Sequence, residues 1–85
     1  MANTFSVRGV WCGAGDLGRS ESEVCAFLDR AQELGFNCIL PNLKWGNGLL
    51  CWPSERFPEC VAPGYRDFDL PAVTLEQCRA RGIEC

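Results

Sequence analysis

A glycine-rich segment near the N-terminus has the spacing of a phosphate-binding loop. Gly13-Ala-Gly-Asp-Leu-Gly18 matches G-x-G-x-x-G, and it follows a strand-like segment and precedes a helical one, as in dinucleotide-binding folds. In those folds the helix begins within the motif, with its amide groups facing the pyrophosphate. Here Ser20 and Glu23 form a capping box that starts the helix after the motif. Dinucleotide binding therefore stays an alternative, and a glycine-rich loop is the better interpretation.

Seven cysteines are the second group of candidate chemical residues. Their odd number, without an export signal at the N-terminus, argues against a disulfide framework, so we expect reduced thiols. The chain has no Cys-x-x-Cys pair and no histidine, so we expect neither a zinc site nor any other metal or cofactor. Four of them recur every thirteen residues, but the residues around them share no pattern of a repeat: Cys12, Cys25, Cys38 and Cys51.

The charges and the hydropathy exclude two classes of partner. The chain has 8 basic and 11 acidic residues, a net charge of −3, and no basic stripe that could follow a nucleic acid. No apolar run is long enough to cross a membrane, and no signal peptide precedes the first strand, so the chain as written is expected in the cytoplasm. Four scattered acids are expected to be surface residues rather than catalysts: Asp16, Glu55, Glu59 and Asp67.

The elements that must position any site alternate between strands and helices. Residues 5–12 and 37–40 are short, apolar and bounded by turn residues, which predicts two strands. Apolar spacing and caps predict helices over residues 20–34 and 69–81, ended by Gly35 and Gly82. Residues 83–85 begin a third strand, and residues 42–68 form a long aromatic-containing loop after the second. This order predicts an α/β fold with parallel strands and helices packed on them.

Several motifs in this order resemble the start of a glycosyl-hydrolase-like bacterial (β/α)8 barrel family. They are Arg8-Gly-Val-Trp11, Glu33-Leu-Gly-Phe-Asn37, Pro63-Gly-Tyr65, and the segment from Glu76 to the Arg-Gly-Ile-Glu sequence at positions 81–84. The resemblance implies that residues 1–85 are a single partial domain, the β-α-β-α-(β) portion of a TIM-type barrel whose full length is about 250 residues. Family members hydrolyse glycosidic bonds, some of them in peptidoglycan glycan strands.

The resemblance also locates a site. Asn42, Lys44, Trp45 and Trp52 correspond to positions near the family's substrate cleft, where polar groups bind sugar hydroxyls and indoles stack on sugar rings. The competing interpretation is that both tryptophans anchor the loop and Lys44 is solvated. The family's catalytic carboxylates lie on later strands, so no catalytic residue is assigned and the chain is expected to be inactive alone. The expected partner is a carbohydrate or glycan, and longer relatives can be exported.

A third interpretation is a small α/β interaction module. A short parallel sheet has open edges, which invite pairing with another chain and therefore self-association. The barrel fragment is preferred to this module, because two or three strands would cover the apolar faces of the helices only in part.

Overall fold

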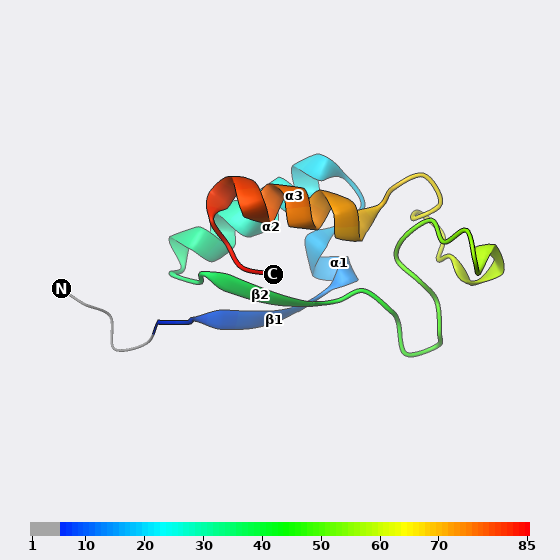
Figure 1. Cartoon of the computed structure of the whole chain (residues 1–85), viewed down its shortest axis with the longest axis horizontal. Helices are drawn as coiled ribbons and strands as arrows, with labels where there is room; N and C mark the ends of the chain where they lie inside the picture. Colours follow the sequence, from blue (N-terminus) through cyan, green and yellow to red (C-terminus); the bar gives the residue numbers. More distant parts are fainter. Residues whose placement is uncertain (1–5) are drawn as a thin grey trace.

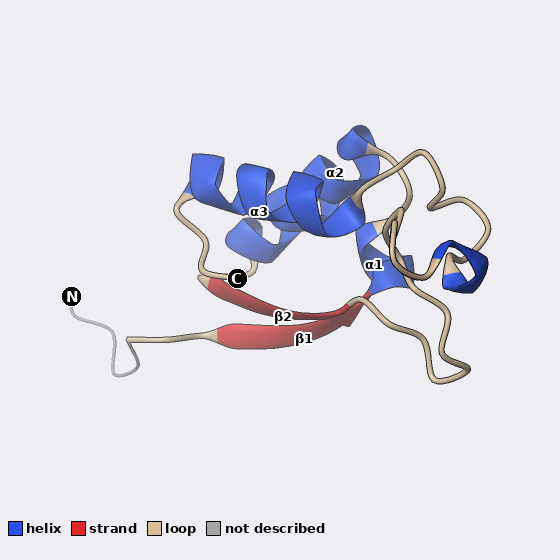
Figure 2. Ribbon diagram, turned by 45° about the vertical axis from the view of Figure 1, so that its right-hand side comes forward, coloured by secondary structure: helices blue, strands red, loops and turns tan. Residues whose placement is uncertain are grey.

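A computed structural model describes residues 6–85 as a small α/β fold (Figures 1 and 2). Two parallel strands, β1 (Gly9–Gly13) and β2 (Cys38–Asn42), pair in a register that runs from Gly9↔Cys38 to Gly13↔Asn42. Two α-helices lie between the strands, α1 (Ala14–Leu17) and α2 (Glu21–Glu33), and β2 is followed by a 3-10 turn, η1 (Pro58–Cys60), and by α3 (Leu70–Arg81). The parallel pairing confirms the predicted crossover between the two strands.

The segment predicted to begin a third strand is parallel to β2. Glu84 forms a parallel bridge with Cys38. Ile39 N donates to Glu84 O over 2.8 Å, and Glu84 N donates to Asn37 O over 3.0 Å. β2 therefore lies between β1 and the segment at Glu84, so spatial order follows sequence order.

The first strand begins later than predicted. Residues 6–8 are not part of β1, and Phe5 lies outside the described residues. Arg8 N donates to the side-chain Oδ1 of Asn37 over 2.7 Å, while Asn37 N donates to Arg8 O over 3.0 Å. The Asn37 side chain thus accepts the hydrogen bond from the Arg8 amide that a backbone carbonyl of a paired strand would otherwise accept.

The segment predicted as a glycine-rich loop contains a short helix, which corrects that prediction. β1 runs to Gly13, and α1 follows it directly. The Asp16 carboxylate accepts a hydrogen bond from Gly13 N over 2.8 Å, which satisfies an amide at the helix start. Four residues are too few to show helical periodicity, so the sequence pattern could not reveal this helix.

The predicted helix caps are present. Ser20 Oγ accepts from Glu23 N over 3.2 Å at the start of α2, and the Glu23 carboxylate reaches Arg19 N over 2.7 Å. Asp69 Oδ1 accepts from Ala72 N over 3.1 Å at the start of α3. Past the helix ends, Gly35 and Gly82 have φ of 91° and 69°, which glycine adopts without strain.

Both long helices cover the same face of the sheet (Figure 2). Their buried residues pack on the strands and on one another to form the core. In α3 the buried stripe is Leu70, Thr74 and Cys78, whereas Leu75 is 49% exposed. The hydroxyl of Thr74 is buried without a hydrogen-bond partner.

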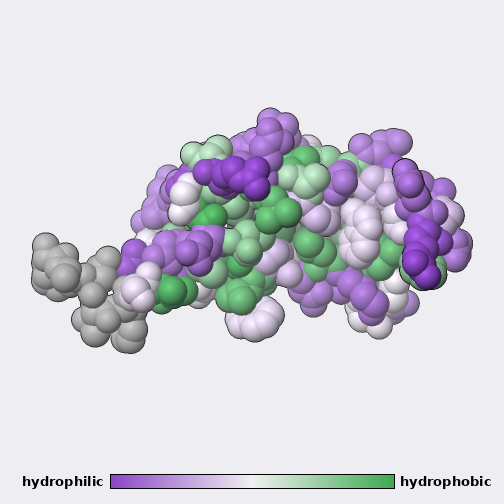
Figure 3. Space-filling view, viewed as in Figure 1, coloured by the Kyte–Doolittle hydropathy of each residue, from purple (hydrophilic) through white to green (hydrophobic). Residues whose placement is uncertain are grey.

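The long loop after β2 is anchored to the core by Tyr65. This side chain is fully buried, and its hydroxyl donates to Gly18 O over 3.3 Å and lies 3.5 Å from Ala14 O. Within the loop, Leu50 N donates to Cys60 O over 2.7 Å and Ala62 N donates to Leu50 O over 2.8 Å. The loop is therefore an ordered part of the fold, with a hydrophilic far end (Figure 3).

The opposite face of the sheet is uncovered. Side chains alternate between the two faces of a strand, so the in-register pair Trp11↔Leu40 points away from the face where Ile39 is buried by the helices. Trp11 is 78% exposed and Leu40 40% exposed. This face of the 85-residue chain is thus apolar and open to solvent.

Candidate functional site

The carboxyl ends of β1 and β2 meet at an open depression of about 260 Å³. The last register pair, Gly13↔Asn42, brings these strand ends together. Polar and aromatic groups from both strands and from α1 line it: Trp11, Cys12, Gly13, Asp16 and Asn42. We take this depression, called the strand-end depression below, as the candidate site.

Its polar groups are a carboxylate and a carboxamide. Asp16 is exposed, and the hydrogen bond from Gly13 N fixes one of its oxygens, which orients the carboxylate at the end of β1. Asn42 is also exposed, and its Oδ1 accepts from Lys44 N over a long 3.4 Å. Together these groups can exchange hydrogen bonds with ligand hydroxyls beside the exposed indole of Trp11.

The thiol in this depression is not poised for nucleophilic chemistry. Burial, together with the negative charges of Asp16 and Cys85, raises the pKa of Cys12 to about 11. The thiolate is the nucleophilic form of cysteine. At neutral pH Cys12 therefore stays protonated and acts as a small core residue.

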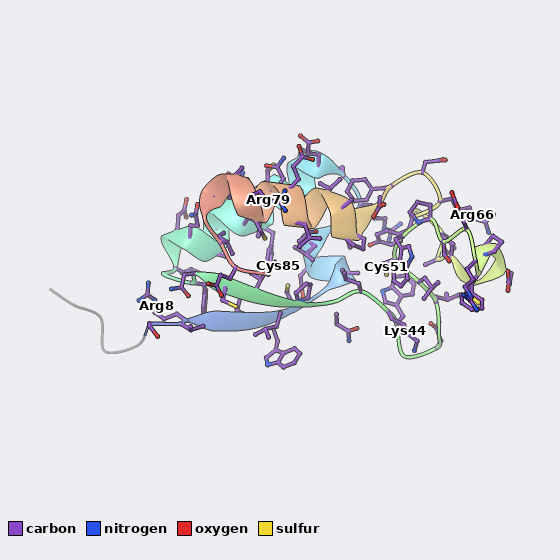
Figure 4. The ribbon with its side chains drawn as sticks, viewed as in Figure 1. Arg8, Lys44, Cys51, Arg66, Arg79 and Cys85 are labelled. Atoms are coloured by element: carbon purple, nitrogen blue, oxygen red, sulfur yellow. The ribbon has the colours of Figure 1, made fainter. Side chains whose placement is uncertain are left out.

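The four residues predicted to bind substrate do not form one cluster. Asn42 lines the strand-end depression, whereas Trp45 lines a separate cavity of about 350 Å³ beside Glu23. Trp45 meets Tyr65 edge to face at a centroid distance of 6.3 Å, so it helps to anchor the loop. Lys44 is exposed on the loop (Figure 4), in an antiparallel bridge with Leu50. Trp52 is half-buried farther along the loop.

Trp11 and Asp16 are the site residues that the sequence analysis did not assign. The alternation of side chains along residues 8–13 could have placed Trp11 on one face of the strand. The alternation alone does not indicate which face of the strand the helices leave uncovered. Asp16 was expected to be a surface acid, and its exposure and its capping of α1 agree with that role.

The glycine motif is poorly suited to a pyrophosphate. The Glu23 carboxylate accepts from Arg19 N over 2.7 Å and lies 3.3 Å from Ser20 Oγ, so an acid already occupies the start of α2. A Cβ on Gly18 would lie 2.5 Å from Glu23 Cβ, which shows how closely this side chain packs there. A phosphate would meet a like charge at this helix start, and β2 ends in Asn42 where an acid should bind the ribose.

The motifs that carry the family resemblance hold the fold together at other points. The Arg8 guanidinium donates to Gly35 O, and the Asn37 carboxamide spans Arg8 N and Ser6 O, which joins the two strands at their amino ends. Figure 4 shows Arg8 at the end of the sheet opposite Lys44. Arg81 pairs with Asp29 of α2 over 2.8 Å. These motif residues thus have structural roles.

No family model, curated protein or solved structure matches this chain. Within residues 6–85, no helix has both the length and the apolar character needed to cross a bilayer. In the same range, no three Cys, Asp or Glu side chains are grouped to hold a metal ion.

Proposed function

We propose that the chain is the opening part of a glycoside-hydrolase-like (β/α)8 barrel, and that its strand ends bind a glycan without hydrolysing it. The main support is the arrangement of β1, β2 and Glu84, which are parallel and in sequence order with both long helices on one face. In a barrel the helices form the outer ring and the opposite strand face lines the interior. The uncovered Trp11 and Leu40 fit that interior face.

The same strand order also occurs in half of a dinucleotide-binding fold. The two architectures differ in whether the helix start after the glycine motif can bind a phosphate. Here a carboxylate accepts a backbone amide hydrogen bond at the start of each helix that follows β1, Asp16 from Gly13 N at α1 and Glu23 from Arg19 N at α2. The barrel is therefore the better supported architecture.

Sugar binding is the chemistry that the strand-end depression offers. The indole of Trp11 presents an exposed face to the apolar side of a sugar ring, and Asp16 and Asn42 supply hydrogen-bonding groups beside it. Lys44, Trp45 and Trp52 lie farther along the same chain segment and would extend the contact surface.

Hydrolysis needs more than this site contains. Glycosidases place two carboxyl groups about 5 to 9 Å apart across the bond that breaks. Asp16 is the one carboxylate that lines the strand-end depression. A glycan bound there would have an acceptor for its hydroxyls but no acid and base pair.

The test is calorimetric titration of the 85-residue chain with peptidoglycan glycan strands, followed by a reducing-end assay. We expect weak binding that Trp11→Ala abolishes and that Phe57→Ala preserves, since Phe57 is an exposed aromatic residue on the distant part of the loop. No new reducing ends should form. Equal binding by both variants would contradict the proposed site, and turnover that Asp16→Asn or Glu55→Gln abolishes would place a catalytic carboxylate in this chain.

One observation favours a second candidate function, a small interaction module. The exposed Trp11 and Leu40 give the sheet an apolar face, Val7 is exposed just before β1, and β1 is an edge strand of the sheet. In this case the chain would self-associate, and Trp11→Lys would restore the monomer. Sedimentation velocity over a range of concentrations separates the two cases, because a purely glycan-binding chain would sediment as a monomer throughout.

A further inference from the structure

A cavity of about 350 Å³ is the neighbour of the strand-end depression. Consecutive residues of α1 line the two spaces, since Asp16 lines the depression and Gly15 lines the cavity. Figure 1 shows α1 at the end of the sheet from which the long loop departs. The cavity is enclosed by α1, by the start of α2 and by the long loop, through Gly15, Gly18, Arg19, Glu23, Trp45 and Tyr65. A ligand longer than one sugar ring can therefore occupy both spaces.

Arg19 gives the cavity a positive charge that no salt bridge neutralises. The ion pairs within residues 6–85 all join other residues. The side chain is held across Gly64, because a Cβ added to Gly64 would lie 2.7 Å from Arg19 Cδ and 3.2 Å from Arg19 Nη1. Gly64 has a φ of 92°, which residues with a Cβ rarely adopt. The glycine thus leaves the space in which the arginine lies, and the guanidinium is positioned at the cavity.

The cavity also offers an aromatic ring and a hydrogen-bond acceptor. The buried Tyr65 holds the Trp45 ring edge to face at a centroid distance of 6.3 Å. Trp45 is nevertheless only half-buried, so part of it stays open to the cavity that it lines. Glu23 uses Oε2 to accept from Arg19 N over 2.7 Å, and its Oε1 has no hydrogen-bond partner within residues 6–85. Oε1 can therefore accept from a ligand.

These groups match a sugar ring that carries a carboxylate. An indole packs against the apolar face of a sugar ring, and a carboxylate oxygen accepts from its hydroxyls. A guanidinium binds a carboxylate through two parallel hydrogen bonds. A phosphate fits less well, because its additional negative charge would be repelled by Glu23 in the same cavity.

We propose that this cavity is a subsite for an acidic sugar, in which Arg19 pairs with the carboxylate and Trp45 packs against the ring. The inference rests on the proposed glycan binding and adds its selectivity, since none of the described residues that line the strand-end depression is basic. Peptidoglycan glycan strands freed of their peptides carry a lactyl carboxylate on alternate sugars. Such a glycan can place a neutral ring at Trp11 and an acidic ring at Trp45.

The experiment compares two soluble glycans that share a sugar backbone. Peptidoglycan glycan fragments carry carboxylates, whereas chito-oligosaccharides carry none. Each is titrated into the nitrogen-15-labelled 85-residue chain while the indole N–H signals of Trp11 and Trp45 are followed. At Trp45 we expect a Kd about two- to fivefold lower for the acidic glycan, the range of a solvent-exposed ion pair. This difference should shrink as salt is added, because salt screens exposed charges.

Three variants locate the effect. Arg19→Gln should bind both glycans equally, whereas Arg66→Gln should keep the preference, because it removes the same charge from an exposed residue that does not line this cavity. Gly15→Leu should weaken the binding of both glycans at Trp45. A Cβ at Gly15 would meet no atom within 4 Å, so the larger side chain would occupy the cavity without disturbing the packing. Circular dichroism checks that each variant is folded.

Three results would overturn the proposal: equal affinity of the parent chain for both glycans, a preference that Arg19→Gln leaves intact, or a Trp45 signal that neither glycan shifts. If the Trp11 signal still shifts and saturates in these cases, glycan binding at the strand-end depression stands without the acidic subsite. If Trp45 responds as expected and Trp11 does not, the acidic subsite stands and binding at the strand-end depression is contradicted.

Discussion

The side chain of Asn37 takes the place of a strand partner for Arg8. Its Oδ1 accepts from Arg8 N over 2.7 Å, its own amide donates to Arg8 O over 3.0 Å, and its Nδ2 donates to Ser6 O over 3.0 Å. One residue at the start of β2 thereby fixes where β1 begins. These hydrogen bonds to Arg8 N and Arg8 O link the Arg8–Trp11 motif to the Glu33–Asn37 motif.

Asn37→Ala should destabilise the fold by about 1–3 kcal/mol, because it leaves the half-buried amide of Arg8 without an acceptor. Urea unfolding followed by circular dichroism measures the change in the free energy of unfolding. Glu76→Ala, at an exposed position of α3, is the control and should change it by less than about 0.5 kcal/mol. Equal effects of the two variants would show that the Asn37 contacts contribute nothing specific.

Gly18→Ala should destabilise the chain by about 2 kcal/mol or more, because Gly18 has a φ of 94° and a Cβ there would meet Glu23 Cβ at 2.5 Å. Gly46→Ala is the matched control, since Gly46 has no positive φ and no atom within 4 Å of the added Cβ. Thermal unfolding compares the two variants. A Gly18→Ala protein as stable as Gly46→Ala would mean that Glu23 does not pack on Gly18.

Several of these elements could be predicted from sequence because their signals are local. Ser20, Asp69, Gly35 and Gly82 are capping residues whose chemistry acts within a few positions, so the bounds of α2 and α3 came out within one residue. The start of β1 depended on Asn37, which is 29 positions from Arg8 along the chain, and no local pattern reports such a contact.

The candidate site was harder to predict for the same reason. Asn42 was predicted from the family resemblance, and it is the last residue of β2. Trp11 was missed because its exposure depends on which sheet face the helices cover, and that is a property of the whole fold. Trp45 was predicted to contact substrate, whereas the structure shows its ring against Tyr65, a contact that joins two separate parts of the loop.

Stability should fall as the pH rises from about 9 to 11. The ordinary pKa of a cysteine is 9.0, which describes the unfolded chain, and burial raises that of Cys12 to about 11 in the folded chain. Below pH 9 both states keep the proton and stability is complete. Between the two pKa values the unfolded chain loses its proton first, so the free energy of unfolding decreases.

Cys78 contributes in the same direction, up to a pKa of about 12. Cys12→Ala should therefore flatten the decline only in part, and Cys12→Ala with Cys78→Ala should flatten it further. Urea unfolding under reducing conditions at about pH 8 and pH 10 measures the slope. A slope in the double variant as steep as that in the parent chain would contradict burial of these thiols.

We propose above that a glycan binds at the strand-end depression. The most direct measurement is a nitrogen-15 NMR titration of the 85-residue chain with soluble peptidoglycan glycan fragments, following its three indole N–H signals. If the glycan binds there, the signals of the Trp11 indole and the Asn42 carboxamide should shift most and saturate together, while that of the Phe57 backbone amide stays unchanged. Shifts confined to residues outside this depression, or none at millimolar sugar, would contradict it.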